Sequence, residues 1–145
     1  MTIIRQPKPN APSPIQCISS ASVSVFWLNQ EQVRGCLKSA VERLAQCHPE
    51  IEEVWLFGSL ARGDALPGSD ADLLIVLRES QTPFLDRSVR YQPDFCGVGV
   101  DVLAYTRPEL AHMQAEGNAL LQRVQSEGIL LFRRAGRREK SSEPA

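Results

Sequence analysis

The chain has 145 residues, enough for one domain of ordinary size, and its hydrophobic content of 43% excludes an intrinsically disordered protein. Lys and Arg number 16 against 17 Asp and Glu, so a formal net charge of −1 gives no reason to expect nucleic acid or an anionic membrane as a partner. No run approaches the roughly 18 apolar residues of a transmembrane helix, and no signal-peptide pattern opens the sequence. We therefore expect a soluble, cytoplasmic protein.

The cysteines point to the same compartment. They are Cys17, Cys36, Cys47 and Cys96. No two of them form a Cys-x-x-Cys pair, and neither His48 nor His112 lies at zinc-ligand spacing from them. We expect the four cysteines to be reduced and to behave as small, mostly buried apolar residues.

The first half of the chain predicts an arm, a helix and a strand. Residues 1–28 are rich in proline at their start, with little apolar periodicity, and predict an extended arm. Asn29 is a candidate N-cap with Gln32 as its capping-box partner, and apolar residues then recur at helical spacing as far as Pro49. The apolar run within 51–57, ended by Gly58, predicts a buried strand.

The second half predicts two more buried strands, at 73–77 and 98–105. Between them, residues 78–97 are ambiguous, and 82–91 could form a short helix with Phe84, Leu85 and Val89 facing inward.

Thr106 and Glu109 have capping-box spacing, so one or two helices should follow to about Glu127, with Gly128 at the C-cap. A last strand at 129–132 precedes a basic tail at 133–145. The order predicts an α/β (α+β) domain with a mixed sheet of about four strands flanked by helices.

The informative segment reads GSLARGDALPGSDADLLIVL, from Gly58 to residue 77. Gly58 ends a strand and permits a sharp turn, and Ser59 adds a hydroxyl at the start of a predicted helix, where free N–H groups favour a phosphate. Arg62 could supply charge to a triphosphate, although pairing with Asp64 or Asp70 is an equally open role.

Three aspartates form a candidate metal site. Asp70 and Asp72 flank one residue at the start of a strand, so their side chains should point to the same side. Asp101 interrupts a buried apolar run, where an unpaired carboxylate would be costly. Neighbouring strands are about 4.8 Å apart, so the three acids could share a pair of Mg²⁺ ions. Other interpretations are an N-cap and a solvated loop acid for Asp70 and Asp72, and an ion pair with Arg62 or Arg90 for Asp101.

On these residues the sequence resembles the minimal nucleotidyltransferase family of the DNA-polymerase-β-like superfamily, over roughly residues 30–132. Gly58-Ser59 resembles the family's Gly-Ser, Asp70 and Asp72 its paired aspartates, and Asp101 its third carboxylate. The resemblance implies a nucleotidyltransferase domain at 29–132, with ATP as substrate and two Mg²⁺ ions.

The same resemblance implies roles for these residues. Asp70 and Asp72 would hold both ions, and Asp101 the ion that activates the acceptor hydroxyl. Ser59 and nearby amides, including that of Gly58, would hold the β- and γ-phosphates.

The resemblance further implies an antitoxin of the MntA-like type, which adds AMP to a tyrosine of a HEPN-type toxin. Two other functions compete with this one: a binding antitoxin that neutralises its partner by contact alone, and a transferase for a small molecule such as an aminoglycoside.

Overall fold

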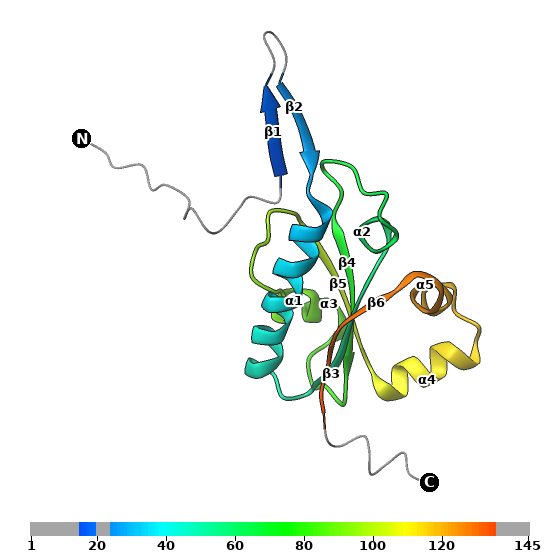
Figure 1. Ribbon diagram of the computed structural model, residues 1–145. Helices are drawn as coiled ribbons and strands as arrows, with labels where there is room; N and C mark the ends of the chain where they lie inside the picture. Colours follow the sequence, from blue (N-terminus) through cyan, green and yellow to red (C-terminus); the bar gives the residue numbers. More distant parts are fainter. Residues whose placement is uncertain (1–14, 20–23, 136–145) are drawn as a thin grey trace.

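The computed structural model describes residues 15–19 and 24–135 (Figure 1). The elements, in chain order, are β1 (Ile15–Ser19), β2 (Ser24–Leu28), α1 (Gln30–Cys47), β3 (Ile51–Phe57), α2 (Ser59–Arg62), β4 (Ala71–Leu77), α3 (Phe84–Arg90), β5 (Val100–Thr106), α4 (Arg107–Ala115), α5 (Ala119–Glu127) and β6 (Ile129–Arg133).

The main sheet is mixed, as the sequence predicts. Its strand order is β5-β4-β3-β6. Strand β3 pairs antiparallel with both β4 and β6, whereas β4 pairs parallel with β5. A parallel pair needs a crossover connection, and residues 78–99, including α3, provide it.

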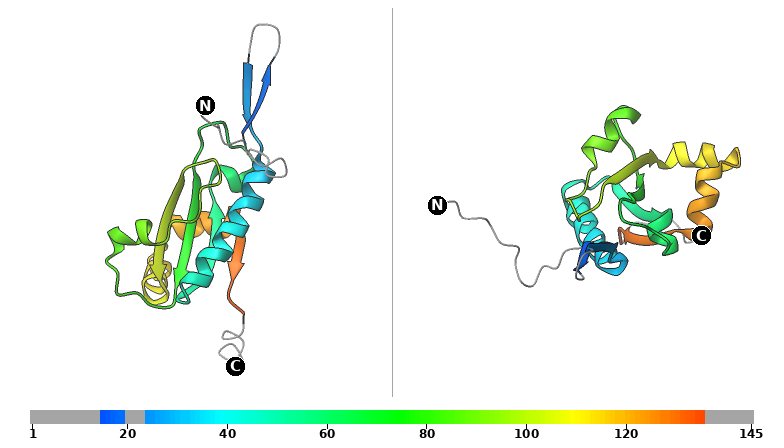
Figure 2. Two further views of the ribbon diagram at one scale, coloured as in Figure 1. Left: turned by 90° about the vertical axis from the view of Figure 1, so that its left-hand side faces the viewer. Right: turned by 90° about the horizontal axis from the view of Figure 1, so that it is seen from above.

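Helices cover both faces of this sheet (Figures 1 and 2). One face packs against α1, whose Val33, Leu37 and Val41 are fully buried. The other face packs Phe57 and Leu74 against α5. Side chains alternate along a strand, so Leu73 and Ile75 of β4 face α1 while Leu74 faces α5. By the same alternation, Asp72 lies on the α5 face.

The predicted helix starts are confirmed at two places. The Asn29 side chain caps α1 by accepting a hydrogen bond from the Gln32 N–H at 3.0 Å, but the predicted capping box is not completed, because Gln32 Oε1 accepts no hydrogen bond from the described residues. Thr106 and Glu109 form a complete capping box at the start of α4. Gly128 ends α5 in an extended conformation rather than a left-handed one.

The orientation predicted for the helix at 82–91 is wrong. Leu85 and Val89 of α3 are 83% and 79% exposed, and Phe84 is 39% exposed. The helix buries Arg87 instead, whose guanidinium donates to Glu109 Oε1 at 2.7 Å and to the Ala104 carbonyl at 3.1 Å. Residues two positions either side of Arg87 must point away from the face that Arg87 occupies. The burial of Arg87, paired with a partly exposed Glu109, has overridden the apolar pattern.

The ends of the chain hold features that the sequence analysis did not predict. Strands β1 and β2 form an antiparallel hairpin within the segment interpreted as an arm. Arg133 belongs to β6, and Arg134 donates to the Ile51 carbonyl at 2.8 Å, so both are part of the folded unit. The rest of the predicted basic tail, at 136–145, lies outside the described residues, as do residues 1–14 of the predicted arm.

The prediction of reduced, mostly buried cysteines is wrong for three of them. Cys36 and Cys96 form a disulfide that joins α1 to the loop before β5, and Cys47 is free and exposed. The pairing could not be read from spacing because the two residues are 60 positions apart.

None of the helices in the described part of the chain is long and apolar enough to cross a membrane.

Reduction of the disulfide should destabilise the domain. Opening a loop of 60 residues restores chain entropy to the unfolded state, so the free energy of unfolding should fall by about 2–4 kcal/mol. Urea denaturation with and without a phosphine reductant measures the change. Cys36→Ser should start at the lower stability and be insensitive to the reductant, and equal stability of the oxidised and reduced wild type would contradict the assignment.

Candidate active site

Three residues lie side by side across the sheet where β4 begins. Phe57 is the antiparallel partner of Asp72, and Asp72 is the parallel partner of Asp101. Residues directly paired in a sheet point to the same face, so both carboxylates lie on the side covered by α5. The structure therefore brings together two of the three acids in the predicted metal site.

Asp70 stands just before β4 and joins the same edge. The Ala71 N–H donates to the Gly99 carbonyl at 2.8 Å, which ties the start of β4 to the residue before β5. The Asp70 carboxylate lies against Gly99, where an added Cβ would come within 2.6 Å of Asp70 Oδ1. Asp70 and Asp101 are both exposed to solvent, while Asp72 is half-buried.

The predicted Gly58-Ser59 turn lies on the side of Asp72 opposite to Asp101, because β3 and β5 flank β4. Gly58 follows β3 with a φ of +83°, a conformation that favours glycine, and an added Cβ would overlap the Asp72 carboxylate. Ser59 then begins α2 and is partly exposed. The glycine is required twice here, by the backbone angle and by the space that the aspartate occupies.

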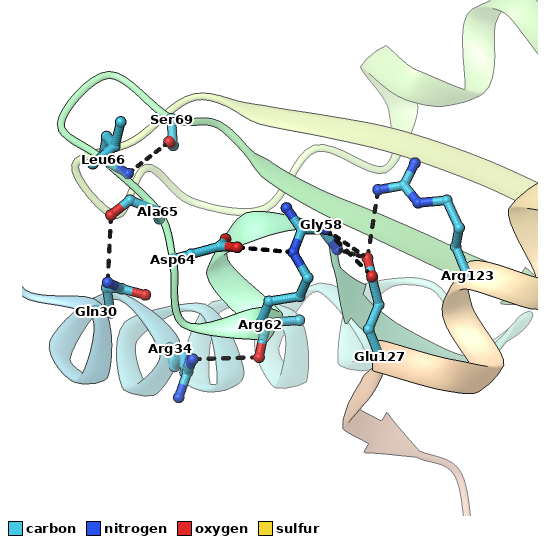
Figure 3. Close-up of polar contacts among 11 residues, drawn as sticks. Gln30, Arg34, Gly58, Arg62, Asp64, Ala65, Leu66, Ser69, Arg123 and Glu127 are labelled. Atoms are coloured by element: carbon cyan, nitrogen blue, oxygen red, sulfur yellow. Dashed lines mark hydrogen bonds and ion pairs between the residues drawn. The ribbon is translucent and has the colours of Figure 1, made fainter.

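Helix α1 fixes the position of this turn (Figure 3). Arg34 donates from Nε to the Leu60 carbonyl at 2.9 Å and from Nη2 to the Ala61 carbonyl at 3.4 Å. Gln30 donates to the Ala65 carbonyl at 3.4 Å. The two Arg34 bonds satisfy carbonyl groups that the four-residue helix leaves without partners, and the Gln30 bond holds the loop that follows the helix.

Glu127 of α5 contacts the turn from the opposite side (Figure 3). Its Oε2 accepts the Gly58 N–H at 2.7 Å, and its carboxylate pairs with Arg62 at 3.3 Å and Arg123 at 3.4 Å. Arg62 also pairs with Asp64 at 3.1 Å. Of the two ion pairs considered for Arg62, the structure forms the one with Asp64, and Glu127 is an additional partner.

Arg90 pairs with Glu50 on another part of the surface, at 3.7 Å. Among the described residues neither Arg62 nor Arg90 pairs with Asp101, so the ion pair considered as an alternative for this acid is not formed.

A cavity of about 540 Å³ opens beside the two paired acids. Its lining includes Asp72 and Asp101 from the sheet, Val89 from α3 and Arg123 from α5. The guanidinium carbon of Arg123 lies 5.3 Å from the centre of the Phe57 ring. The sequence analysis named Glu127 only as a helix end and did not consider Arg123; their spacing of four residues on one helix was the available signal.

The acids repel one another in the absence of a cation. Burial raises the pKa of Asp72 above its ordinary value, and the charges of Asp101, Asp70 and Glu127 raise it further, while Arg123 opposes them. Within the described residues, no group of three or more His, Cys, Asp or Glu side chains lies close enough together to hold a metal ion. The acids nonetheless fit a hard divalent cation in type, because carboxylate oxygens are its preferred ligands and its charge would relieve their repulsion.

Comparison with known proteins gives one family. The sequence profile of a family described as "Nucleotidyltransferase domain" matches residues 37–123, more than half of the chain. The match includes the Gly58-Ser59 turn and the three aspartates. No curated protein sequence matches the chain significantly.

Two solved structures resemble the fold. The first, a protein from Sulfolobus solfataricus provisionally named a nucleotidyltransferase, is 27% identical with a TM-score of 0.52, and the match covers 72% of this chain and 84% of that one. The second, described as a toxin–antitoxin with AMP-PNP, is 17% identical with a TM-score of 0.45, covers 72% of this chain and 77% of that one, and is too distant to support an argument about function.

Asp72→Asn should stabilise the metal-free protein at neutral pH. The raised pKa means that ionised Asp72 is less favourable in the folded than in the unfolded chain, a penalty present above the folded pKa and lost as the pH falls toward about 3.9. We expect the thermal midpoint to rise by roughly 1–3 °C at pH 7, and this difference from wild type to vanish in acid. Differential scanning calorimetry in a chelator checks both; a lower midpoint at pH 7 would contradict the repulsion.

Glu127→Gln should show the opposite dependence. Burial alone would raise the pKa of Glu127, but the Gly58 N–H and the guanidinium groups of Arg62 and Arg123 outweigh it and hold the pKa below its ordinary value. The ionised carboxylate therefore stabilises the fold above the unfolded pKa, and this contribution is lost as the pH falls through the folded pKa. Glu127→Gln should be less stable than wild type at pH 7 and approach it in acid, as denaturation at several pH values would show.

Proposed function

Because the chain belongs to the family of nucleotidyltransferase domains, we propose that it transfers a nucleoside monophosphate, AMP from ATP, to a hydroxyl acceptor. The observation that carries this proposal is the pairing of Asp72 with Asp101 across parallel strands, on the same face and beside the Gly58-Ser59 turn. A binding protein has no evident need for two mutually repelling acids at the mouth of a cavity.

Apart from Arg62, which pairs with Asp64 and Glu127, each predicted site residue has a task in this reaction. Asp70, Asp72 and Asp101 would hold two Mg²⁺ ions, which when bound supply charge neutralisation at the phosphates and lower the pKa of the acceptor hydroxyl. The Ser59 hydroxyl and the first N–H groups of α2 would hold the β- and γ-phosphates. Gly58 allows the turn, while its own N–H is taken by Glu127. Catalysis is then mostly positioning of the two reactants.

The surface beside the cavity favours a protein acceptor. Val89 lines the cavity and is 79% exposed, and Leu85, one helical turn away on α3, is 83% exposed. Apolar side chains exposed together on a surface favour contact with another protein. We propose a tyrosine of a HEPN-type toxin as the acceptor, with the chain acting as an antitoxin of the MntA-like, minimal nucleotidyltransferase type.

Transfer of label from ATP tests this function. The purified chain, incubated with Mg²⁺, α-labelled ATP and a helical protein encoded beside it, should label that protein on tyrosine. Asp70→Asn and Asp101→Asn should each reduce the rate roughly 10²–10³-fold, because each removes charge stabilisation of the transition state. Asp94→Asn is the matched control, since Asp94 is an exposed acid that pairs with Arg43 and is not among the described residues that line the cavity.

The other outcomes separate the competing functions. Label on a small hydroxylated molecule would instead indicate a small-molecule transferase. A tight complex with the partner, unaffected by Asp70→Asn and without label, would indicate neutralisation by contact alone. Full activity of Asp101→Asn would contradict the proposed role of the third acid.

A further inference from the structure

The positively charged guanidinium of Arg123 lies over the row of paired residues Phe57, Asp72 and Asp101. Arg123 of α5 lines the cavity together with Asp72 and Asp101, and its guanidinium lies over the ring of Phe57, the β3 partner of Asp72. The side chain is 51% exposed, so it is accessible from the cavity. A positive group therefore lies next to two of the acids, in the same cavity.

Two contacts hold Arg123 in place. Its Nη2 donates to Glu127 Oε2 at 3.4 Å, and Glu127 is itself fixed by the Gly58 N–H at 2.7 Å. The Phe57 ring, only 3% exposed, supports the guanidinium by a cation–π contact. A guanidinium carries five N–H donors in a planar fork, so Arg123 can contact a phosphate without releasing Glu127.

Arg62, the arginine that the sequence analysis selected, is less suited to this task. It is shared between Asp64 at 3.1 Å and Glu127 at 3.3 Å, and the cavity lining within the described chain does not include it. Two acidic partners largely neutralise its charge. Arg123 has one such partner and faces the cavity.

We propose that Arg123 binds the β- or γ-phosphate of the nucleoside triphosphate, and that Glu127 is the positioning residue that holds it there. The inference rests on the proposed function and extends it to a residue outside the Gly-Ser and aspartate motif. Transfer of the α-phosphoryl group breaks its bond to the β-phosphate oxygen and releases pyrophosphate. A contact to these phosphates therefore acts both in binding and on the leaving group, so its loss should lower kcat/KM.

Calorimetry with ATP and AMP tests the phosphate contact. In the presence of Mg²⁺, Arg123→Ala should weaken ATP binding roughly 10- to 100-fold, the usual cost of one hydrogen bond to a charged group, and change AMP binding less than about twofold. Arg123→Lys keeps the charge without the planar fork of N–H donors, so its ATP affinity should lie between those of wild type and Arg123→Ala. Gln122→Ala, an exposed neighbour on α5, should behave as wild type.

A double-mutant cycle tests the positioning role. Glu127→Gln should weaken ATP binding when Arg123 is present and have little further effect in the Arg123→Ala background. Equal effects in the two backgrounds would assign Glu127 to the Gly58 turn alone and overturn its positioning role. Thermal unfolding of each variant shows that binding is compared between folded proteins.

The results distinguish failure of this inference from failure of the proposed function. Equal losses of ATP and AMP affinity in Arg123→Ala, or no loss of either, would overturn the phosphate contact even if Asp70→Asn abolished transfer. A wild type that binds no ATP with Mg²⁺ would overturn the proposed function, and this inference with it. A kcat/KM for ATP lowered at least about tenfold in Arg123→Ala would support the contact, and a kcat/KM equal to that of wild type would contradict it.

Discussion

The candidate site depends on the register between β4 and β5. Asp72 and Asp101 are neighbours only because residue 72 pairs with residue 101 in a parallel ladder. A slip of one residue would turn Asp101 to the opposite face of the sheet, beside fully buried residues of β4 such as Ala71 and Leu73, where a carboxylate would be strongly unfavourable. The apolar residues that alternate with the acids therefore fix the register, and the register fixes the distance between the acids.

Two glycines leave space for aspartates of the site because they have no side chain. Gly58 and Gly99 lie against Asp72 and Asp70, and a Cβ at either position would press on a carboxylate oxygen. Asp70 and Asp72 thus each have one glycine against their carboxylate, and the two glycines are 41 positions apart in the sequence. A side chain at either glycine would occupy the space that the carboxylate needs.

Local patterns predicted the part of the fold that local forces determine. The strand at 51–57 and the capping box at Thr106 follow from apolar runs and from side chains that bond their own backbone. Which face of α3 is buried could not be predicted from local patterns. Arg87 is buried where it pairs with Glu109, a residue of a different helix, α4. The Cys36–Cys96 disulfide and the contacts of Glu127 with Gly58 and Arg62 join residues at least 60 positions apart. A single sequence carries no periodic signal for such pairs.

Charge balance explains why nucleotide and cation should bind together. The described site gathers Asp70, Asp72, Asp101 and Glu127 around Arg62 and Arg123, so acids outnumber bases before any ligand arrives. A triphosphate adds several negative charges to a region where burial and the neighbouring acids already raise the pKa of Asp72. Arg123 offsets part of that repulsion, but one guanidinium that also pairs with Glu127 cannot offset all of it. In the proposed reaction, divalent cations that bind with the nucleotide would supply the remaining positive charge, and the three aspartates would be their ligands.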